Sequence, residues 1–339
     1  MYKIFRPLLF SLDPETSHRL TLQLLRLAGN FPPSNRLLTQ LYKTESKPVR
    51  AFGLNFKNSI GLAAGYDKDG LAIRGLAALG FGHVEIGTVT PKPQAGNARP
   101  RVFRLAEDGA VINHMGFPSQ GMLKVAGRIS KIGGRRSVVM GINLGKNKDT
   151  PLEEAASDYI ELMHQFIFLA DYLTINISSP NTVGLRRLQG RDMLEGLLGA
   201  IQKEREEIAL GRGGNAPILV KISPDMNEEE LDDAVGVVLD KKMDGVIATN
   251  TTLAREGLRS RLQSESGGLS GLPLKERSEA VLSRVVQRVG GKIPIVSAGG
   301  IMTPDDAKKR LALGASLVQV YTGLVYHGPG LVKAIIESL

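Results

Sequence analysis

Eight short apolar runs, rich in β-branched residues, recur along most of the chain. They are Ile60–Ala64, Val84–Gly87, Val138–Asn143, Tyr172–Asn176, Ile218–Ile222, Gly245–Thr249, Ile295–Ala298 and Leu317–Tyr321. Helical patterns separate most of them, namely Asp69–Leu79, Leu152–Phe168, Met193–Ala209, Asn227–Lys241, Leu274–Val289 and Pro304–Leu313. Apolar strands that alternate with helices indicate a parallel sheet buried on both faces. Eight such units predict a closed (β/α)8 TIM barrel rather than an open sheet.

Two connections between the predicted strands are long. Arg99–Phe103 and Gly109–Asn113 are short alternating runs around a turn, which predicts a β-hairpin inserted at the top of the barrel. Arg255–Gly271 is polar and rich in glycine, so we expect a long loop with a functional role.

The first 44 residues differ from the repeating part. Leucines at helical spacing predict two short helices, Pro14–Leu27 and Ser34–Tyr42, joined by a turn. We therefore expect an N-terminal helical segment at residues 1–44 and a barrel domain at residues 45–339. The helices are either a cap packed on the barrel or an apolar hairpin that rests on a bilayer and leads to a lipidic substrate.

Composition excludes several classes of function. The chain has no cysteine, which removes disulfides, thiolate zinc sites and a cysteine nucleophile. Its five histidines show no metal-ligand spacing, so no metal is expected. The net charge of +9 favours anionic partners, but Lys and Arg are spread along the chain, which argues against nucleic acid. The sequence offers neither a membrane-spanning run nor a signal peptide, and a cytoplasmic protein is the default expectation.

The strand ends carry the candidate chemistry, because active sites of such barrels lie at the C-terminal mouths of the strands. Amides, hydroxyls and lysines dominate these positions, and acids are few. The strand-end residues are Ala64, Gly65, Tyr66, Asp67, Lys68, Gly87, Thr88, Asn143, Lys146, Asn176, Ser179, Lys221, Thr249, Asn250, Thr251, Gly299, Gly300, Tyr321, Thr322 and Gly323. Small residues after the last two strands leave backbone N–H groups free, which predicts a phosphate site there.

The residues alone do not decide the roles of the serine and the two lysines at these strand ends. Ser179 follows the strand in a run that contains no histidine or acid, so it is either a hydrogen-bonding residue or a base with unusual activation. Lys68 and Lys221 could form a Schiff base, balance an anionic ligand or simply be solvated. The many amides and the predicted phosphate site favour electrostatic stabilisation.

Several long motifs, found in order, resemble those of class 2 dihydroorotate dehydrogenase. They are AAGYDKDG, GTVTPKPQAGN, NHMGF, GINLGKNKDTP, NISSPNT, VKISPD, ATNTT, GGLSG and the ending SAGGI to GASLVQVYTGL. The similarity extends over residues 1–339. It implies one FMN per chain, oxidation of dihydroorotate to orotate in pyrimidine biosynthesis, and transfer of electrons to a membrane quinone, ubiquinone or menaquinone.

The resemblance also implies roles for individual residues. Ser179 is similar to the general base that takes the proton from C5 of the substrate while hydride leaves C6 for the flavin. The implied substrate-binding residues are Lys68, Asn113, His114, Met115, Gly116, Phe117, Asn176, Asn181, Asn250 and Thr251. The implied FMN-binding residues are Ala64, Gly65, Tyr66, Asp67, Lys68, Thr88, Asn143, Asn176, Lys221, Thr249, Gly271, Gly300, Tyr321 and Thr322. His18 and Arg104 are expected near the quinone path.

The lack of cysteine agrees with class 2, because class 1 relatives use a cysteine base and soluble acceptors. The N-terminal helices then become a quinone entrance on the bilayer. This implies a monomer, peripheral on the cytoplasmic face of a bacterial inner membrane. His114, Pro118 and Val183 depart from the family pattern and put rate and substrate affinity in doubt.

Three alternatives remain open on the residues alone. A flavin reductase acting on RNA dihydrouridine would use the positive charge, but it normally needs a cysteine acid. A cofactor-free Schiff-base lyase would be built on Lys221. A non-enzymatic membrane-binding module would explain the N-terminal helices and leave the strand-end residues without a role.

Overall fold

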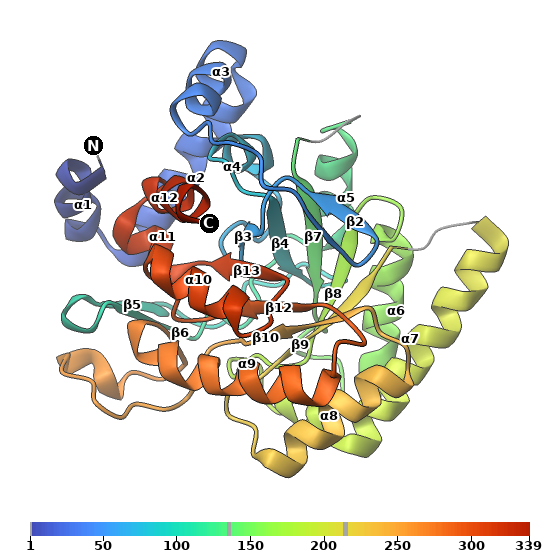
Figure 1. Cartoon of the computed structure of the whole chain (residues 1–339). Coiled ribbons are helices and arrows are strands. Elements are labelled where there is room, and N and C mark those ends of the chain that lie inside the picture. The colour runs from blue at the N-terminus through green and yellow to red at the C-terminus, as the bar shows by residue number, and fades with distance from the viewer. Residues whose placement is uncertain (1, 134–136, 213–215) are drawn as a thin grey trace.

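Eight parallel strands close into a barrel in the computed structural model, which describes residues 2–133, 137–212 and 216–339 (Figure 1). The barrel strands are β3 (Ile60–Leu62), β4 (His83–Val89), β7 (Val139–Leu144), β8 (Tyr172–Asn176), β9 (Ile218–Ile222), β10 (Gly245–Ala248), β12 (Ile295–Ala298) and β13 (Leu317–Val320). They follow one another around the barrel in chain order, and β13 pairs with β3 to close it. The predicted (β/α)8 barrel is confirmed.

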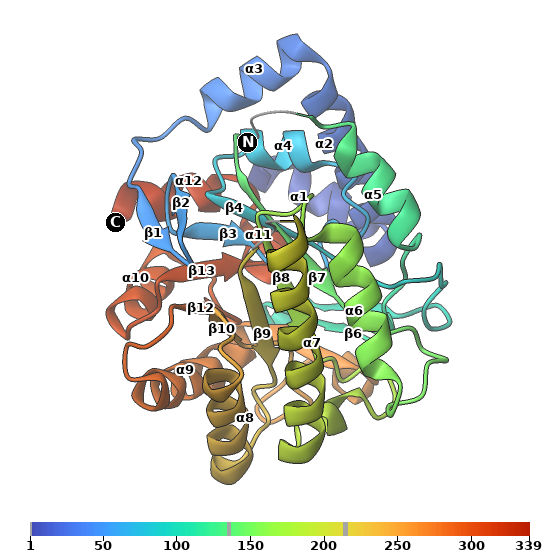
Figure 2. The same cartoon turned by 90° about the vertical axis from the view of Figure 1, so that its right-hand side faces the viewer.

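Helices surround the barrel and cover its outer face (Figures 1 and 2). Six were predicted, with bounds that shift by a few residues: α4 (Ile73–Ala78), α6 (Ala155–Phe166), α7 (Arg191–Arg212), α8 (Glu228–Asp240), α9 (Lys275–Val289) and α10 (Pro304–Ala312). Three others were not predicted: α5 (Met122–Ser130), α11 (Thr322–His327) and α12 (Gly330–Ser338). Capping boxes start α8 at Asn227 and α10 at Thr303, which satisfies backbone N–H groups of each first turn.

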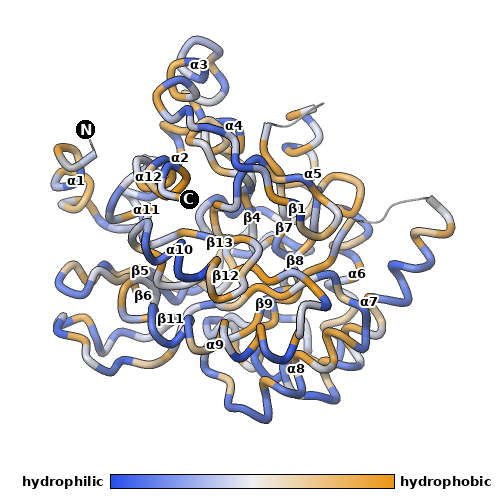
Figure 3. The backbone as a smooth tube through the Cα atoms, in the orientation of Figure 1, coloured by the Kyte–Doolittle hydropathy of each residue, from blue (hydrophilic) through white to orange (hydrophobic). Residues whose placement is uncertain are grey.

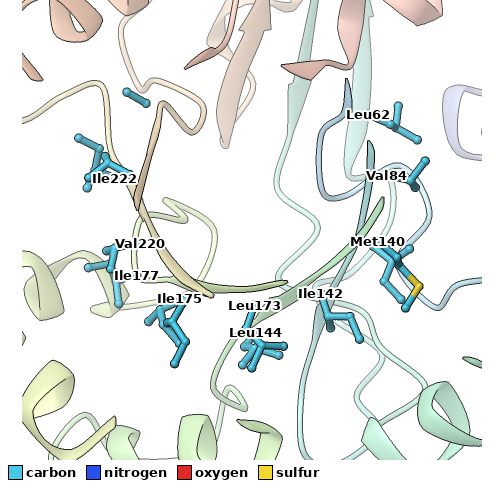
Figure 4. Close-up of a cluster of buried hydrophobic side chains, with 14 of the residues drawn as sticks. Leu62, Val84, Met140, Ile142, Leu144, Leu173, Ile175, Ile177, Val220 and Ile222 are labelled. Atoms are coloured by element: carbon cyan, nitrogen blue, oxygen red, sulfur yellow. The ribbon is translucent and has the colours of Figure 1, made fainter. Parts of the chain in front are cut away.

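The main core lies between the strands and these helices. Figure 4 shows part of it, including Ile142 on β7, Leu173 on β8 and Val220 on β9. Leu162 of α6 and Leu198 of α7 belong to the same buried cluster. Side chains alternate along each strand, so the neighbouring positions point into the barrel instead.

The lower interior of the barrel is apolar and tightly packed. A small antiparallel hairpin that the sequence patterns did not reveal, β1 (Val49–Ala51) and β2 (Leu54–Phe56), contributes Phe56 to an interior cluster with Leu219 and Ile247. Glycine is required at two interior positions. A Cβ on Gly61 would lie 2.0 Å from the His83 ring, and one on Gly141 would lie 2.1 Å from the Tyr172 ring.

A three-stranded antiparallel sheet stands apart from the barrel strands. The predicted hairpin is confirmed as β5 (Val102–Leu105) and β6 (Ala110–Asn113), with Gly109 in the left-handed region at φ +56° in its turn. The segment 255–271, expected as loop, ends in a strand, β11 (Gly268–Gly271), that pairs with β6. The expectation of an unstructured loop is therefore wrong for its last four residues, because they meet an open strand edge.

Three helices precede the barrel: α1 (Tyr2–Ser11), α2 (Pro14–Asn30) and α3 (Pro32–Leu41). The last two were predicted and begin or end a few residues away from the expected bounds. The first was not predicted, because it contains Pro7, and proline disfavours the interior of a helix. Glu15 of α2 accepts hydrogen bonds from Arg99 and Arg101 in the segment before β5, which fastens α2 to the barrel domain.

These three helices carry many exposed apolar side chains, and apolar stretches alternate with polar ones along them (Figure 3). The exposed large apolar side chains on them or between them are Ile4, Phe5, Leu8, Leu20, Leu24, Leu27, Phe31, Leu37 and Leu41. No helix in the described ranges is both long and apolar enough to cross a bilayer.

Two glycines set the distance between α2 and α4. A Cβ on Gly29 would lie 2.3 Å from the Gly75 nitrogen, and one on Gly75 would lie 2.1 Å from the Leu25 carbonyl oxygen. The helix backbones therefore touch directly, and both partners at the contact are backbone atoms that cannot rotate away.

We predict that Gly75→Ala destabilises the protein by about 1–3 kcal/mol, because the added methyl forces α2 away from α4. Chemical denaturation measures the change. Gly127→Ala is the matched control, since Gly127 lies in α5 with nothing within 4 Å of its added Cβ. That change leaves stability equal or slightly raised. Equal stability of both variants would contradict the close helix contact.

Candidate functional site

A cavity opens at the C-terminal mouth of the barrel, with about 980 Å³ of empty space that includes its solvent-filled opening. Most of the sequence-predicted site residues line it. They are Ala64, Gly65, Lys68, Thr88, Asn113, Met115, Gly116, Phe117, Asn176, Ser179, Asn181, Lys221, Thr249, Asn250, Thr251, Gly271, Gly300, Tyr321 and Thr322.

Five predicted residues have their side chains elsewhere. Lys146 is buried and donates to two backbone carbonyl oxygens. Asp67 is buried and accepts hydrogen bonds from backbone N–H groups at the start of α4. Tyr66 lines a neighbouring cavity, and Asn143 lies below the floor of the first one. His114 contacts the Ser266 carbonyl oxygen through Nδ1 at 2.9 Å and so turns toward the loop before β11.

Two lysine ammonium groups give the cavity its positive charge. Lys221 is buried and Lys68 is partly buried, and neither donates a hydrogen bond to any other residue that the structure describes. Burial lowers the pKa of Lys68 to about 8 and also lowers that of Lys221. No described acidic side chain lines the cavity. The arrangement therefore suits an anionic ligand, which would satisfy both cations.

The ends of β12 and β13 supply backbone donors. Gly299 and Gly300 have φ angles of +106° and +72°, and a Cβ on Gly300 would lie 2.3 Å from the Lys275 Cα. Among the described groups, none accepts a hydrogen bond from the N–H of Gly300 or Gly323. Such free N–H groups, pointing from a glycine-rich turn, are typical of a phosphate site.

Amide side chains form the opposite wall. Asn181 donates from Nδ2 to Asn113 Oδ1 at 3.1 Å, and Asn250 donates from Nδ2 to Ser178 Oγ at 2.9 Å. Asn181 Oδ1 and Thr251 Oγ1 are buried and have no hydrogen-bond partner among the described residues. Unpaired buried polar atoms are costly, so these two are suited to a polar ligand.

Ser179 lies at this wall and is 5% exposed. Its Oγ accepts a hydrogen bond from the Asn181 backbone N–H at 3.2 Å. No described histidine or carboxylate lines the cavity to act as its base. Its hydroxyl is therefore positioned by the backbone, in a water-poor place, rather than by a catalytic triad.

One arginine ties the loop that carries Ser179 to the loop after β10. Arg186 donates from Nε to the Ser178 carbonyl oxygen at 3.1 Å and from Nη2 to the Thr251 carbonyl oxygen at 2.9 Å. It also pairs with Asp225, Nη1 to Oδ2, at 2.9 Å. Three charge-assisted contacts from one rigid fork hold both loops in register.

A second, largely apolar cavity lies between the N-terminal helices and the barrel mouth. His18 and Arg104, the two residues expected near the quinone path, line it. The His18 ring packs edge-on against Tyr66 with centroids 4.8 Å apart, and burial lowers its pKa to about 4, so it is neutral at pH 7. Arg104 donates to the Leu9 carbonyl oxygen at 2.9 Å at the end of α1. Met115 and Tyr321 line both cavities and form the wall between them.

Several lining residues were not predicted. Gln319, Ser270 and Met302 line the first cavity, and Tyr2 and Phe10 of α1 line the second. Alternation along β13 could have revealed Gln319, since every second residue of a barrel strand points inward. The α1 residues gave no such signal, because that helix was not predicted.

Comparison with known sequences identifies the family. The sequence profile described as dihydroorotate dehydrogenase matches residues 47–339. This chain belongs to the dihydroorotate dehydrogenase family. It is 48% identical over 340 residues to the dihydroorotate dehydrogenase (quinone) of Azotobacter vinelandii, covering 100% of this chain and 96% of the relative. The Pseudomonas putida KT2440 protein of the same name is 47% identical, with 100% and 98% covered.

Solved structures of the family share the fold. The dihydroorotate dehydrogenase of Eimeria tenella in complex with ferulenol superposes with a TM-score of 0.89 at 40% identity, covering 98% of this chain and 93% of that one. The ligand-free form from the same organism gives 0.87 at 41% identity, covering 96% and 94%. The agreement includes almost the whole chain, N-terminal helices as well as barrel.

We predict that Arg186→Gln lowers the free energy of unfolding by about 1–3 kcal/mol, because two backbone carbonyl groups and Asp225 lose a charged donor. Hydrogen exchange should quicken in the loops at residues 177–190 and 249–254. Arg187→Gln is the matched control, since the neighbouring Arg187 is exposed. If both variants exchange at the parent rate, the two loops do not depend on this arginine.

Proposed function

We propose that this chain oxidises dihydroorotate to orotate in pyrimidine biosynthesis, with a quinone as the final electron acceptor. One observation carries the proposal: Lys68, Lys221 and Ser179 converge with a group of asparagine amides on a single cavity that no described acid lines. Relatives named dihydroorotate dehydrogenase (quinone), at 46–48% identity over the whole chain, support the same activity and acceptor.

The cavity has the features that FMN requires. Backbone N–H groups of Gly300 and Gly323 would hold its phosphate, and the Lys221 ammonium would lie near its ring. When bound, FMN supplies the hydride acceptor, and a nearby cation favours its reduced, negatively charged form. Lys221 has no other hydrogen-bond acceptor in the described chain, so the cofactor would relieve a buried charge. We propose one FMN per chain.

The asparagine wall suits the substrate. Orotate is planar and carries a carboxylate, ring carbonyl groups and ring N–H groups, so amides that both donate and accept match its edge. Asn113, Asn176, Asn181 and Asn250 would bind that edge. Lys68 would face the carboxylate, because below a pH of about 8 its ammonium is charged and lacks a hydrogen-bonding partner.

Ser179 is the residue that we assign to proton removal. Its Oγ would take the proton from C5 of dihydroorotate and pass its own hydroxyl proton to solvent at the cavity opening, while hydride leaves C6 for the flavin. The hydroxyl is a weak base, so catalysis depends on position and on exclusion of water rather than on basicity. Burial of Ser179 and its hydrogen bond from the Asn181 N–H support that role.

The second cavity would bind the quinone. Its apolar lining suits a quinone ring and lipid tail, with neutral His18 and charged Arg104 as polar groups at its walls. Its wall shared with the first cavity, Met115 and Tyr321, would keep the two reactants close without contact. The exposed apolar faces of α1 to α3 would rest on the membrane surface around this cavity.

The remaining proposals concern organisation in the cell. We propose that residues 1–44 act as the membrane and quinone segment and residues 45–339 as the catalytic domain. The protein would be a monomer, held on the cytoplasmic face of a bacterial inner membrane by the exposed apolar side chains of these helices.

The visible spectrum of the purified protein tests the function. We expect flavin bands that bleach when dihydroorotate is added without oxygen and return when a quinone follows. A protein that stays colourless with added FMN would overturn the proposal. Trapping of a substrate by borohydride on Lys221 would then favour a Schiff-base lyase. Flavin bands that dihydroorotate does not bleach would support FMN as the cofactor but reject dihydroorotate as the substrate.

We predict that Ser179→Ala lowers kcat by roughly 10²–10⁴-fold, because the group that receives the C5 proton is gone. The dissociation constant of orotate should change little, since the asparagine amides remain. Steady-state kinetics and flavin-perturbation titrations measure the two values. Full activity of the variant would reject Ser179 as the base.

We predict that the double variant Phe5→Ser and Leu27→Ser binds lipid vesicles at least several-fold more weakly, because two exposed apolar side chains leave the helical face. Vesicle flotation measures the bound fraction. Leu210→Ser is the control, because Leu210 is 90% exposed but lies on α7. Equal binding of all three proteins would contradict a membrane-facing N-terminal segment.

A further inference from the structure

A fully buried carboxylate lies beneath the cavity floor and has no part in the proposed reaction. Glu85 of β4 is 0% exposed and does not line the cavity. Three donors from three other strands converge on it. Asn143 Nδ2 donates to Oε1 at 2.8 Å, while the Tyr172 hydroxyl at 3.1 Å and Gln319 Nε2 at 2.9 Å donate to Oε2. A carboxylate removed from water needs such donors to stay charged.

This acceptor dictates the direction of the hydrogen bonds above it. Because a carboxylate only accepts, Asn143 must turn its NH₂ group toward Glu85 and its Oδ1 toward the cavity. That Oδ1 accepts from Thr88 Oγ1 at 2.6 Å and from Asn176 Nδ2 at 2.9 Å. Because Nδ2 of Asn176 faces Asn143, its Oδ1 faces Asn250, whose Nδ2 donates to it at 3.3 Å. The carboxylate thus sets the Asn143 amide directly. The next two amides are held in the same order by backbone N–H groups, since Ser178 donates to Asn176 Oδ1 at 3.3 Å and Thr251 donates to Asn250 Oδ1 at 2.8 Å.

Glu85 also acts on the buried cation of the floor. Burial lowers the pKa of Lys221, whereas the negative charge of Glu85 acts in the opposite direction and raises it. Tyr172, Gln319 and Asn143 are neutral, so they can hold the carboxylate but cannot balance Lys221. Gln319, which donates to Glu85, also lines the cavity that Lys221 lines, so the carboxylate lies directly beneath that cavity.

We propose that Glu85 is a positioning residue for the cavity floor: it fixes the direction of the Asn143 amide, through which Asn176 is held in order, and it offsets the charge of Lys221. This proposal rests on the proposed function, because the ligands of that floor are FMN and orotate. The amides are then oriented before a ligand arrives, and the positive charge beside the flavin is partly balanced.

Glu85→Gln tests both parts of the proposal in the flavin-loaded protein. A glutamine at this position can donate as well as accept, so Asn143 can reverse and the amide order is lost. We expect the dissociation constant of orotate to rise roughly 10–100-fold, the usual cost of losing an outer partner of a binding residue. We expect the flavin reduction potential to become more positive, because Lys221 is no longer balanced.

Tyr172→Phe is the matched control. It removes one donor to the same carboxylate but leaves the charge of Glu85 and its bond to Asn143 in place. We expect its potential and its orotate affinity to equal those of the parent. If Glu85→Gln changes neither value, or if both variants change them alike, Glu85 only fills space and the proposal is overturned.

Two further measurements keep the test decisive. If Glu85→Gln fails to fold, Glu85→Asp is the substitute, because it keeps the charge but moves the carboxylate away from Asn143. Orotate affinity should then fall while the flavin reduction potential stays the same. Unchanged affinity would overturn the proposal. Should the parent bind no flavin, the proposed function fails separately. A double-mutant cycle of Glu85→Gln and Lys221→Met in urea unfolding then decides: coupling supports charge balance, and additive effects overturn it.

Discussion

Burying ammonium groups without hydrogen-bond acceptors is unfavourable, and the organisation of this molecule follows from how that cost is met. Lys68 and Lys221 lie at one cavity that no described acid lines. An anionic ligand that accepts hydrogen bonds from these ammonium groups, and binds only the folded state, would therefore stabilise the protein. A closed barrel tolerates the arrangement because eight strands fix the backbone from which the side chains project.

The barrel interior separates into an apolar base and a polar upper part. Aromatic rings fill the base, and glycines on neighbouring strands make room for them. Above them, Glu85 and its donors form the transition to the cavity floor. The same eight strands thus supply packing energy at one end and oriented polar groups at the other, so stability and binding depend on different layers.

The sequence predicted the barrel well because buried parallel strands have a strong, local signature. Elements without that signature were missed: α1 contains Pro7, β1 and β2 have three residues each, and β11 is part of a glycine-rich stretch. Their structure depends on tertiary contacts rather than on a repeating apolar pattern.

The sequence predicted which residues lie near the site better than it predicted the orientations of their side chains. Strand ends meet at one mouth, so most of the chosen residues do line one cavity. Sequence does not say which way a side chain turns. Asp67 is held by the start of α4, Asn143 by Glu85, and His114 by the Ser266 carbonyl group. Their roles, like that of Ser179, remain predictions.

The two cavities have a consequence for inhibitors. Met115 and Tyr321 separate an acid-free, polar compartment from an apolar one, and each compartment has its own set of remaining walls. A flat lipophilic compound in the apolar compartment would leave the polar one open. Such a compound would be noncompetitive toward an anionic substrate, and its selectivity would depend on α1, α2, the β5–β6 hairpin and α11, which line that compartment.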